Sequence, residues 1–253
     1  RGERKSRPHR MLLSDDAGWG GNGAVSLPGK GELLWAYPNA GELGYYRLTF
    51  GRAALRRLLE HKNELTAVER SGLLNNLWAQ VRAGNLPVAE FLESLAAFRG
   101  DPSRLIVEDA AAYLKVMRQE LSATDAERDA LGVFAAGFFG AHLERLGWDK
   151  KKGEKQEATM TRPTVLNALA LLAPKSLDQA EVSARLEKYL ADPSSVDSSV
   201  APVILTAAAR RNEPALFDAF RARLAAPKTP EQKSLMLRAL AEFSEPALHD
   251  RYL

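Results

Sequence analysis

The side chains that could do catalytic chemistry are few in this sequence, and they lie far apart along the chain. The four histidines are His9, His61, His142 and His249. None lies three or four residues from another, and no HExxH motif is present. The chain contains no cysteine, which excludes disulfides, thiolate metal sites and thiol nucleophiles. The sequence therefore predicts no metal site built from local ligands.

Three other polar motifs have ordinary explanations that we favour over chemistry. The glycine run GWGGNG at 18–23 lacks the strand and helix that flank a phosphate-binding loop, so we expect a hairpin loop. Asp15 and Asp16 could bind calcium, but capping a turn is the favoured role. Lys150–Lys152 could contact phosphate, but acidic residues lie in the same loop, so we expect these lysines to be ordinary solvated charges. With no GxSxG motif either, we predict no catalytic, cofactor-binding or metal-binding residues.

The composition is that of a globular protein with a mixed surface. Of the 253 residues, 45% are hydrophobic and 26% charged, which is enough for one large domain, or a large one with a small appendage. The chain has 35 basic and 32 acidic residues, so its charge is nearly balanced and nucleic acid is not an expected partner. No apolar run is long enough to predict a transmembrane helix, and no signal peptide is visible.

The first residue, Arg1, is not a methionine, so we expect a fragment or a processed product. The compartment stays unknown, with the cytoplasm slightly favoured. The basic stretch 1–10 is read as a solvated terminus or edge strand in preference to a nucleic-acid patch. Short strands are expected at 10–15 and 24–27, and two extended arms around a turn at 33–50.

From residue 51 onward, apolar residues recur with the helical period of 3.6. Thr66 with Glu69, and Thr124 with Glu127, match the capping-box pattern at helix starts. Short connectors that contain proline separate the later helices, which favours an irregular α-solenoid of HEAT-like helical repeats preceded by a few β-strands. After a first helix striped by Leu55, Leu58 and Leu59, helices are expected at 66–84, 87–100, 101–121, 124–147, 163–173, 178–191, 197–211, 213–225, 230–243 and 245–253.

The stretch WAYPNAGELGYYRLTF at 35–50 resembles a strand of the aminopeptidase N family of zinc metallopeptidases. In that family a small β-sandwich precedes a large helical domain, and the last sandwich strand is similar to W-x-x-x-N-x-x-x-x-G-[FY]-Y-R-[VL]-x-[YF]. The resemblance thus makes this stretch the end of one domain that leads into the next. The residues that match are Trp35, Asn39, Gly44, Tyr45, Tyr46, Arg47, Leu48 and Phe50.

Three later stretches resemble the same family in the right order, so that the resemblance covers 33–253. Residues 65–95 are similar to its first helix pair, with Glu69-Arg70 and Asn75-Asn76 where the family has Asp-Arg and a later Asp. Residues 146–169 match a stretch that runs from LGW through an acidic loop to Leu-Arg, with Thr161 in place of leucine. Residues 200–253 resemble the helical repeats of the family.

The resemblance implies a remnant of the β-sandwich at 1–50 and a helical-repeat domain at 51–253, truncated at its C-terminus. The zinc-binding catalytic domain of the family has no counterpart in this sequence. We therefore expect a non-catalytic C-terminal domain that encloses the substrate cavity of a zinc aminopeptidase and restricts access to peptides. The fragment should be inactive alone, with zinc only in the parent, and its partners should be the parent's catalytic domain and peptide substrates.

Two other functions stay open at this point. A free-standing helical-repeat module could bind a protein through its concave face. An RNA-binding solenoid is weakened by the near balance of charge.

The helices nearest the C-terminus carry basic residues opposite their apolar stripes. We expect Arg210, Arg211 and Arg238 to face either the catalytic domain or the C-terminal half of a peptide, where positive charge favours a carboxylate. The alternative is that they are ordinary solvated arginines. Within the earlier segments, strand alternation predicts Tyr45 and Tyr46 on opposite faces.

Overall fold

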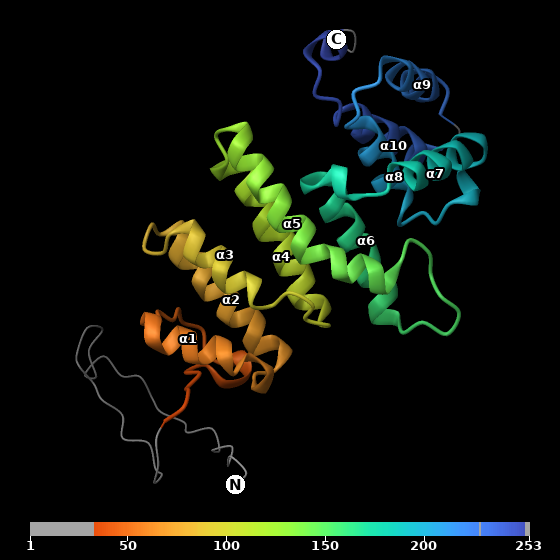
Figure 1. Cartoon of the computed structure of the whole chain (residues 1–253). Coiled ribbons are helices and arrows are strands. Elements are labelled where there is room, and N and C mark those ends of the chain that lie inside the picture. The colour runs from red at the N-terminus through yellow and green to blue at the C-terminus, as the bar shows by residue number, and fades with distance from the viewer. Residues whose placement is uncertain (1–32, 228, 251–253) are drawn as a thin grey trace. The chain divides into compact units, whose positions relative to one another are not determined.

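The computed structural model describes residues 33–227 and 229–250, the side chain of His249 excepted. The chain divides into two compact units, one that ends at Ala79 and one that begins at Gln80. Eleven α-helices lie in the described residues (Figure 1). They are α1 (Arg52–Glu60), α2 (Ala67–Arg82), α3 (Val88–Ala96), α4 (Arg104–Val116), α5 (Asp125–Leu146), α6 (Gln156–Leu172), α7 (Gln179–Ala191), α8 (Ala201–Ala209), α9 (Pro214–Ala225), α10 (Pro230–Leu240) and α11 (Pro246–His249).

In the first unit, α1 and α2 follow the segment 33–50, which is extended apart from a 3₁₀ turn at Ala40–Glu42. Residues 41–50 alternate strictly between exposed and half-buried, as a strand would. The described part of the chain nevertheless contains no β-strand, so the predicted strands are not confirmed. A strand is defined by a ladder with a second strand, and within 33–79 none is formed. The strands expected at 10–15 and 24–27 lie outside the described residues.

The start of α2 follows the predicted capping box. The Thr66 hydroxyl accepts a hydrogen bond from the Glu69 N–H (3.3 Å), and the Glu69 carboxylate accepts one from the Thr66 N–H (2.8 Å). Leu73, Leu74 and Trp78 of α2 are buried and belong to its apolar face.

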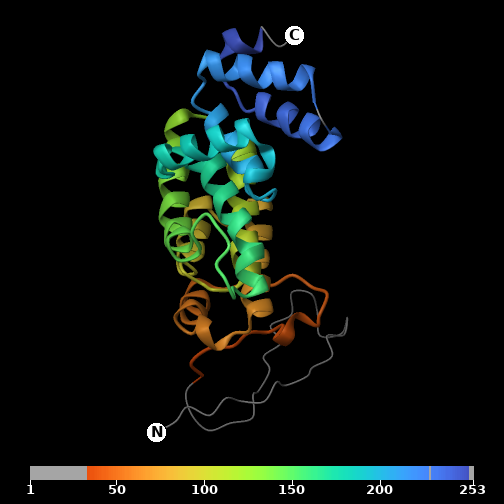
Figure 2. The same cartoon turned by 90° about the vertical axis from the view of Figure 1, so that its right-hand side faces the viewer.

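In the second unit, α6 packs against α4 and α5, and α8 packs against α6 and α7 (Figure 1). Towards the C-terminus, α10 lies beside α8 and α9, in the blue part of Figure 2. Contacts thus run between helices that are close in sequence. Their core is rich in phenylalanine, and the phenylalanines with essentially no exposed surface are Phe91, Phe98, Phe138, Phe139, Phe217, Phe220 and Phe243.

Local signals fix most helix ends in this unit. The predicted box of Thr124 with Glu127 opens α5, and Gly147 ends it with φ of 67°. Helices α9, α10 and α11 each begin at a proline, whose missing N–H costs nothing in the first turn.

Several helix ends differ from the expectation by about one turn, and two helices differ in a way that has a local explanation. The helix expected at 163–173 begins at Gln156, and Pro163 lies inside it. The added turn is held by the Thr161 hydroxyl, which donates to the Glu157 carbonyl (2.8 Å). The helix expected to run to 121 leaves α-helical geometry at Met117 and ends in a π-helical turn, Met117–Leu121.

Candidate functional site

The asparagine of the 35–50 motif closes a tight loop. Asn39 is buried, its Oδ1 accepts a hydrogen bond from the Gly44 N–H (2.8 Å), and its Nδ2 donates to the Gly44 carbonyl (3.0 Å). Gly41, inside the loop, has φ of 68°, a conformation that favours glycine. At Gly44, a Cβ would come within 2.1 Å of the Tyr46 ring. The asparagine and both glycines of the motif therefore have structural explanations.

A carboxylate from the same loop lies against α2. Glu42 accepts hydrogen bonds from the Tyr37 hydroxyl and from the Asn39 amide (3.2 Å). Burial and the neighbouring Glu42 raise the pKa of Tyr37. The close approach depends on Gly72 of α2, where an added Cβ would meet the Glu42 carboxylate at 2.1 Å.

Two side chains of α2 bind the backbone of the preceding segment. The Glu69 carboxylate accepts from the Gly41 N–H (2.9 Å), and the Asn76 Oδ1 accepts from the Leu48 N–H (2.9 Å). Asn76 is buried and its Nδ2 donates to the Gly72 carbonyl (2.8 Å), so both ends of its amide are used. Burial of Glu69 raises its pKa, but hydrogen bonds from Thr66 and Gly41 outweigh this effect and lower it. We call Glu69 and Asn76 the α2 clamp.

The other residues of the motif are placed differently. Trp35 stacks on His61, with ring centroids 6.3 Å apart. Tyr45 and Arg47 are exposed, whereas Tyr46 is half-buried and its hydroxyl donates to the Pro38 carbonyl (2.9 Å). The two tyrosines thus differ in exposure, but neither is fully buried.

A buried arginine joins the end of α5 to α6. Arg162 donates to the carbonyls of Leu146 (3.2 Å) and Gly147 (3.1 Å) and forms an ion pair with Glu154. These carbonyls have no partner within α5, so Arg162 caps the helix. The pairing explains why the 146–169 stretch combines LGW, an acidic loop and an arginine. Sequence reasoning noted this pattern but did not single out Arg162.

The predicted basic residues do not gather in one place. Arg210 donates to Glu242 through Nε (3.1 Å) and a terminal nitrogen (2.7 Å). Arg211 donates to the Ser183 hydroxyl (2.8 Å). Arg238 is exposed on α10. Arg210 also lines a pocket.

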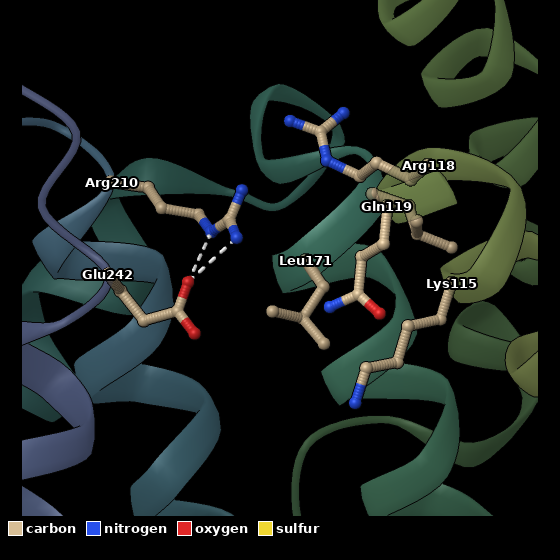
Figure 3. A pocket seen from close by; sticks show the side chains of 7 residues that line it. Lys115, Arg118, Gln119, Leu171, Arg210 and Glu242 are labelled. Atoms are coloured by element: carbon tan, nitrogen blue, oxygen red, sulfur yellow. Dashed lines mark hydrogen bonds and ion pairs between the residues drawn. The ribbon is translucent and has the colours of Figure 1, made fainter. Parts of the chain in front are cut away.

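That pocket has a volume of about 270 Å³. It lies where the end of α4 and its π-helical turn approach α6, α8 and the turn after α10 (Figure 3). Sequence reasoning missed its two other cations, because a lysine and an arginine on a helix resemble ordinary solvated charges. The lining residues are Lys115, Arg118, Gln119, Leu171, Leu172, Arg210 and Glu242.

The described residues contain no group of three or more histidine, aspartate or glutamate side chains that could hold a metal ion. His61 lies beside Glu64 (2.7 Å), and His142 is buried against Phe138. His9, the pair Asp15 and Asp16 and the glycine run at 18–23 lie outside the described residues. Within the same limits, no helix is both long and apolar enough to cross a membrane.

Comparison with known proteins gives a match over most of the chain. The profile of the family described as the ERAP1-like C-terminal domain matches residues 35–253. Aminopeptidase M1-A of Oryza sativa subsp. japonica is 27% identical over 146 residues, 56% of this chain and 17% of that protein. Aminopeptidase M1 of Arabidopsis thaliana is 28% identical over 166 residues, 64% of this chain and 19% of that protein.

Tricorn protease-interacting factor F2 of Thermoplasma acidophilum is 28% identical over 134 residues, 53% of this chain and 16% of that protein. The matches thus span between 16% and 19% of these relatives. The match begins at Trp35, the first residue of the 35–50 motif, and includes the α2 clamp and the later helices. The chain therefore belongs to the ERAP1-like C-terminal domain family and represents a C-terminal region of an aminopeptidase N family protein.

Proposed function

We propose that this chain is the non-catalytic helical domain of a zinc aminopeptidase, and that it encloses the substrate cavity so that peptides enter and folded proteins do not. The family match over 35–253 is the observation that carries the proposal. Enclosure would remove bulk water from the catalytic site and hold the peptide during reaction. The zinc, its ligands and the general base would come from the parent's catalytic domain.

We also propose the domain division at 50/51 and an irregular solenoid for 51–253. Within the second unit, packing between helices of α4 to α10 that are close in sequence supports the solenoid. The first is supported by the change from the extended 33–50 segment to helix at Arg52.

The apolar surface of the 33–50 segment favours a domain within a larger enzyme over a free-standing interaction module. The side chains of Leu43 and Tyr45 are 82% and 108% exposed, and Leu33 and Leu34 are 54% and 41% exposed. All four belong to one segment of 13 residues, which is more exposed apolar side chain than a short segment with no covering partner needs to carry. We propose that the parent's preceding domain covers them.

A comparison of two substrates of the full-length enzyme tests the enclosure. Arg238→Ala and Arg210→Ala would each be assayed with a single-residue anilide and with a peptide of about ten residues. If these arginines face bound peptide, kcat/KM should fall for the peptide alone, because the anilide does not reach them. Lys233→Ala, an exposed charge on the same helix as Arg238, is the control. Equal effects on both substrates would reject a role in holding peptide.

A further inference from the structure

The pocket between α4, α6 and α8 is unusual in its charges. Two of its lining residues, Lys115 and Arg118, form no hydrogen bond or ion pair with any residue that the structure describes. Arg210 is paired with Glu242, so that pair contributes no net charge. The pocket thus holds two positive charges with no negative charge bound to either, although Arg118 is half-buried.

Arg118 and Arg210 line the pocket from opposite sides. In Figure 3 the side chain of Arg118 extends from the π-helical turn at the right to a position above Leu171, and that of Arg210 comes from the left. Burial lowers the pKa of Arg118, and the charges of Arg210 and Arg128 lower it further, while Asp129 and Asp125 act in the opposite direction. A half-buried cation with no anion bound to it is destabilised relative to one in water.

Hydrogen-bond donors in the pocket also remain available. The Nε and one terminal nitrogen of Arg210 both donate to the same oxygen of Glu242, Oε2. The other terminal nitrogen of Arg210 has no partner in the described chain. Arg118 and Gln119 lie on the same π-helical turn, where the Ser122 N–H bonds to the Met117 carbonyl (2.9 Å). Such turns are rare and occur frequently at functional sites.

We propose that this pocket binds a free oxyanion of the phosphate class between Arg118 and Arg210. A guanidinium presents a planar fork of donors that matches an oxyanion. Two guanidiniums and the Gln119 amide offer more donors than the two oxygens of a carboxylate can accept, whereas phosphate has enough acceptor oxygens for all three groups. The second unpaired charge, that of Lys115, adds to the attraction for a dianion. This proposal stands on the pocket alone and is independent of the function proposed above.

Titration of the 253-residue chain with inorganic phosphate, followed by calorimetry at constant pH and ionic strength, tests the site. We expect one saturable site that Arg118→Gln weakens at least ~10-fold, which corresponds to about 1.4 kcal/mol. Arg238→Gln removes an exposed arginine that does not line the pocket and should leave binding unchanged. Arg118→Gln removes a repulsion and should not lower the unfolding midpoint, which checks that the variant is folded.

A second variant should change binding in the opposite direction. Glu242→Gln frees Arg210 from its ion pair, so we expect phosphate to bind several-fold more tightly. Sodium acetate at the same ionic strength should bind much more weakly than phosphate. The proposal is overturned if phosphate does not bind, if Arg118→Gln binds it as well as the unaltered chain does, or if acetate binds equally.

Discussion

At the scale of single residues, the α2 clamp binds backbone N–H groups of the 33–50 segment through two side chains. Asn76 uses both ends of its amide, one on Leu48 and the other on Gly72. The bond to Leu48 matters more for stability, because without Asn76 the Leu48 N–H would lose this hydrogen bond, whereas the Gly72 carbonyl lies inside α2 and keeps its backbone partner in the helix. The stability of the 33–50 segment should therefore depend on this residue.

We expect Asn76→Ala to lower the free energy of unfolding by roughly 1–3 kcal/mol, because the Leu48 N–H loses its partner. Asn75→Ala is a matched control, since Asn75 is the neighbouring asparagine and is exposed. Urea denaturation followed by circular dichroism measures both. If the two variants lose equal stability, the clamp does not hold the segment.

His142 makes stability depend on pH. It is buried, Arg145 lies 3.4 Å from its Nδ1, and its Nε2 has no partner among the described residues. Burial and the Arg145 charge lower its pKa below the usual 6.5. The unfolded chain therefore binds a proton more readily than the folded chain, and stability falls as pH drops below about 6.5.

The free energy of unfolding, measured between pH 7 and pH 5, should decrease for the unaltered chain. In His142→Leu, which cannot titrate at this position, that decrease should be smaller. An identical decrease in both proteins would assign the pH dependence to other groups.

At the scale of elements, the period of the apolar residues and the capping boxes were enough to predict most helices. Thr66 with Glu69 and Thr124 with Glu127 mark helix starts because their hydrogen bonds are local. The start of α6 could not be predicted in this way. Pro163 resembles a proline in the first turn of a helix, but α6 begins at Gln156. The buried ion pair between Arg162 and Glu154 lies across that start and joins residues eight positions apart.

The strands expected within 33–50 are not confirmed. Residues 41–50 alternate in exposure as a strand would, but a β-ladder also needs a partner strand. The pocket could not be predicted either, because Arg118 and Arg210 lie far apart in sequence and only the packing of α4, α6 and α8 brings them together.

The phase of α2 can be checked at Trp78. We expect Trp78→Ala to cost about 3–5 kcal/mol, because the ring is only 9% exposed. Val68→Ala, on the same helix and 48% exposed, is the control and should cost far less. A loss below ~1 kcal/mol for Trp78→Ala would contradict the core assignment.

At the scale of the whole molecule, the exposed apolar residues should govern how the chain behaves alone. We expect Leu43→Ser with Tyr45→Ser to reduce self-association of the chain, because these side chains are fully accessible. Light scattering at increasing protein concentration measures this. In the full-length enzyme the same pair should instead lower the unfolding midpoint. No change in either protein would show that no domain covers this surface.

The chain alone should have no peptidase activity and bind no stoichiometric zinc, because catalysis is assigned to the parent's other domain. Hydrolysis of an amino-acid anilide and metal content by mass spectrometry measure the two properties. Turnover by the pure chain that a chelator abolishes would be incompatible with the proposed function.

The α2 clamp also has a mechanical consequence. Glu69 and Asn76 lie seven residues apart on one helix, which at 1.5 Å per residue separates them by about 10 Å along its axis. A segment tethered at one point can swivel about it, whereas a segment tethered at two points along a rigid rod cannot. The direction in which the chain enters α1 is thus set by α2, and a pull on residues 41–48 would act on that helix as a torque.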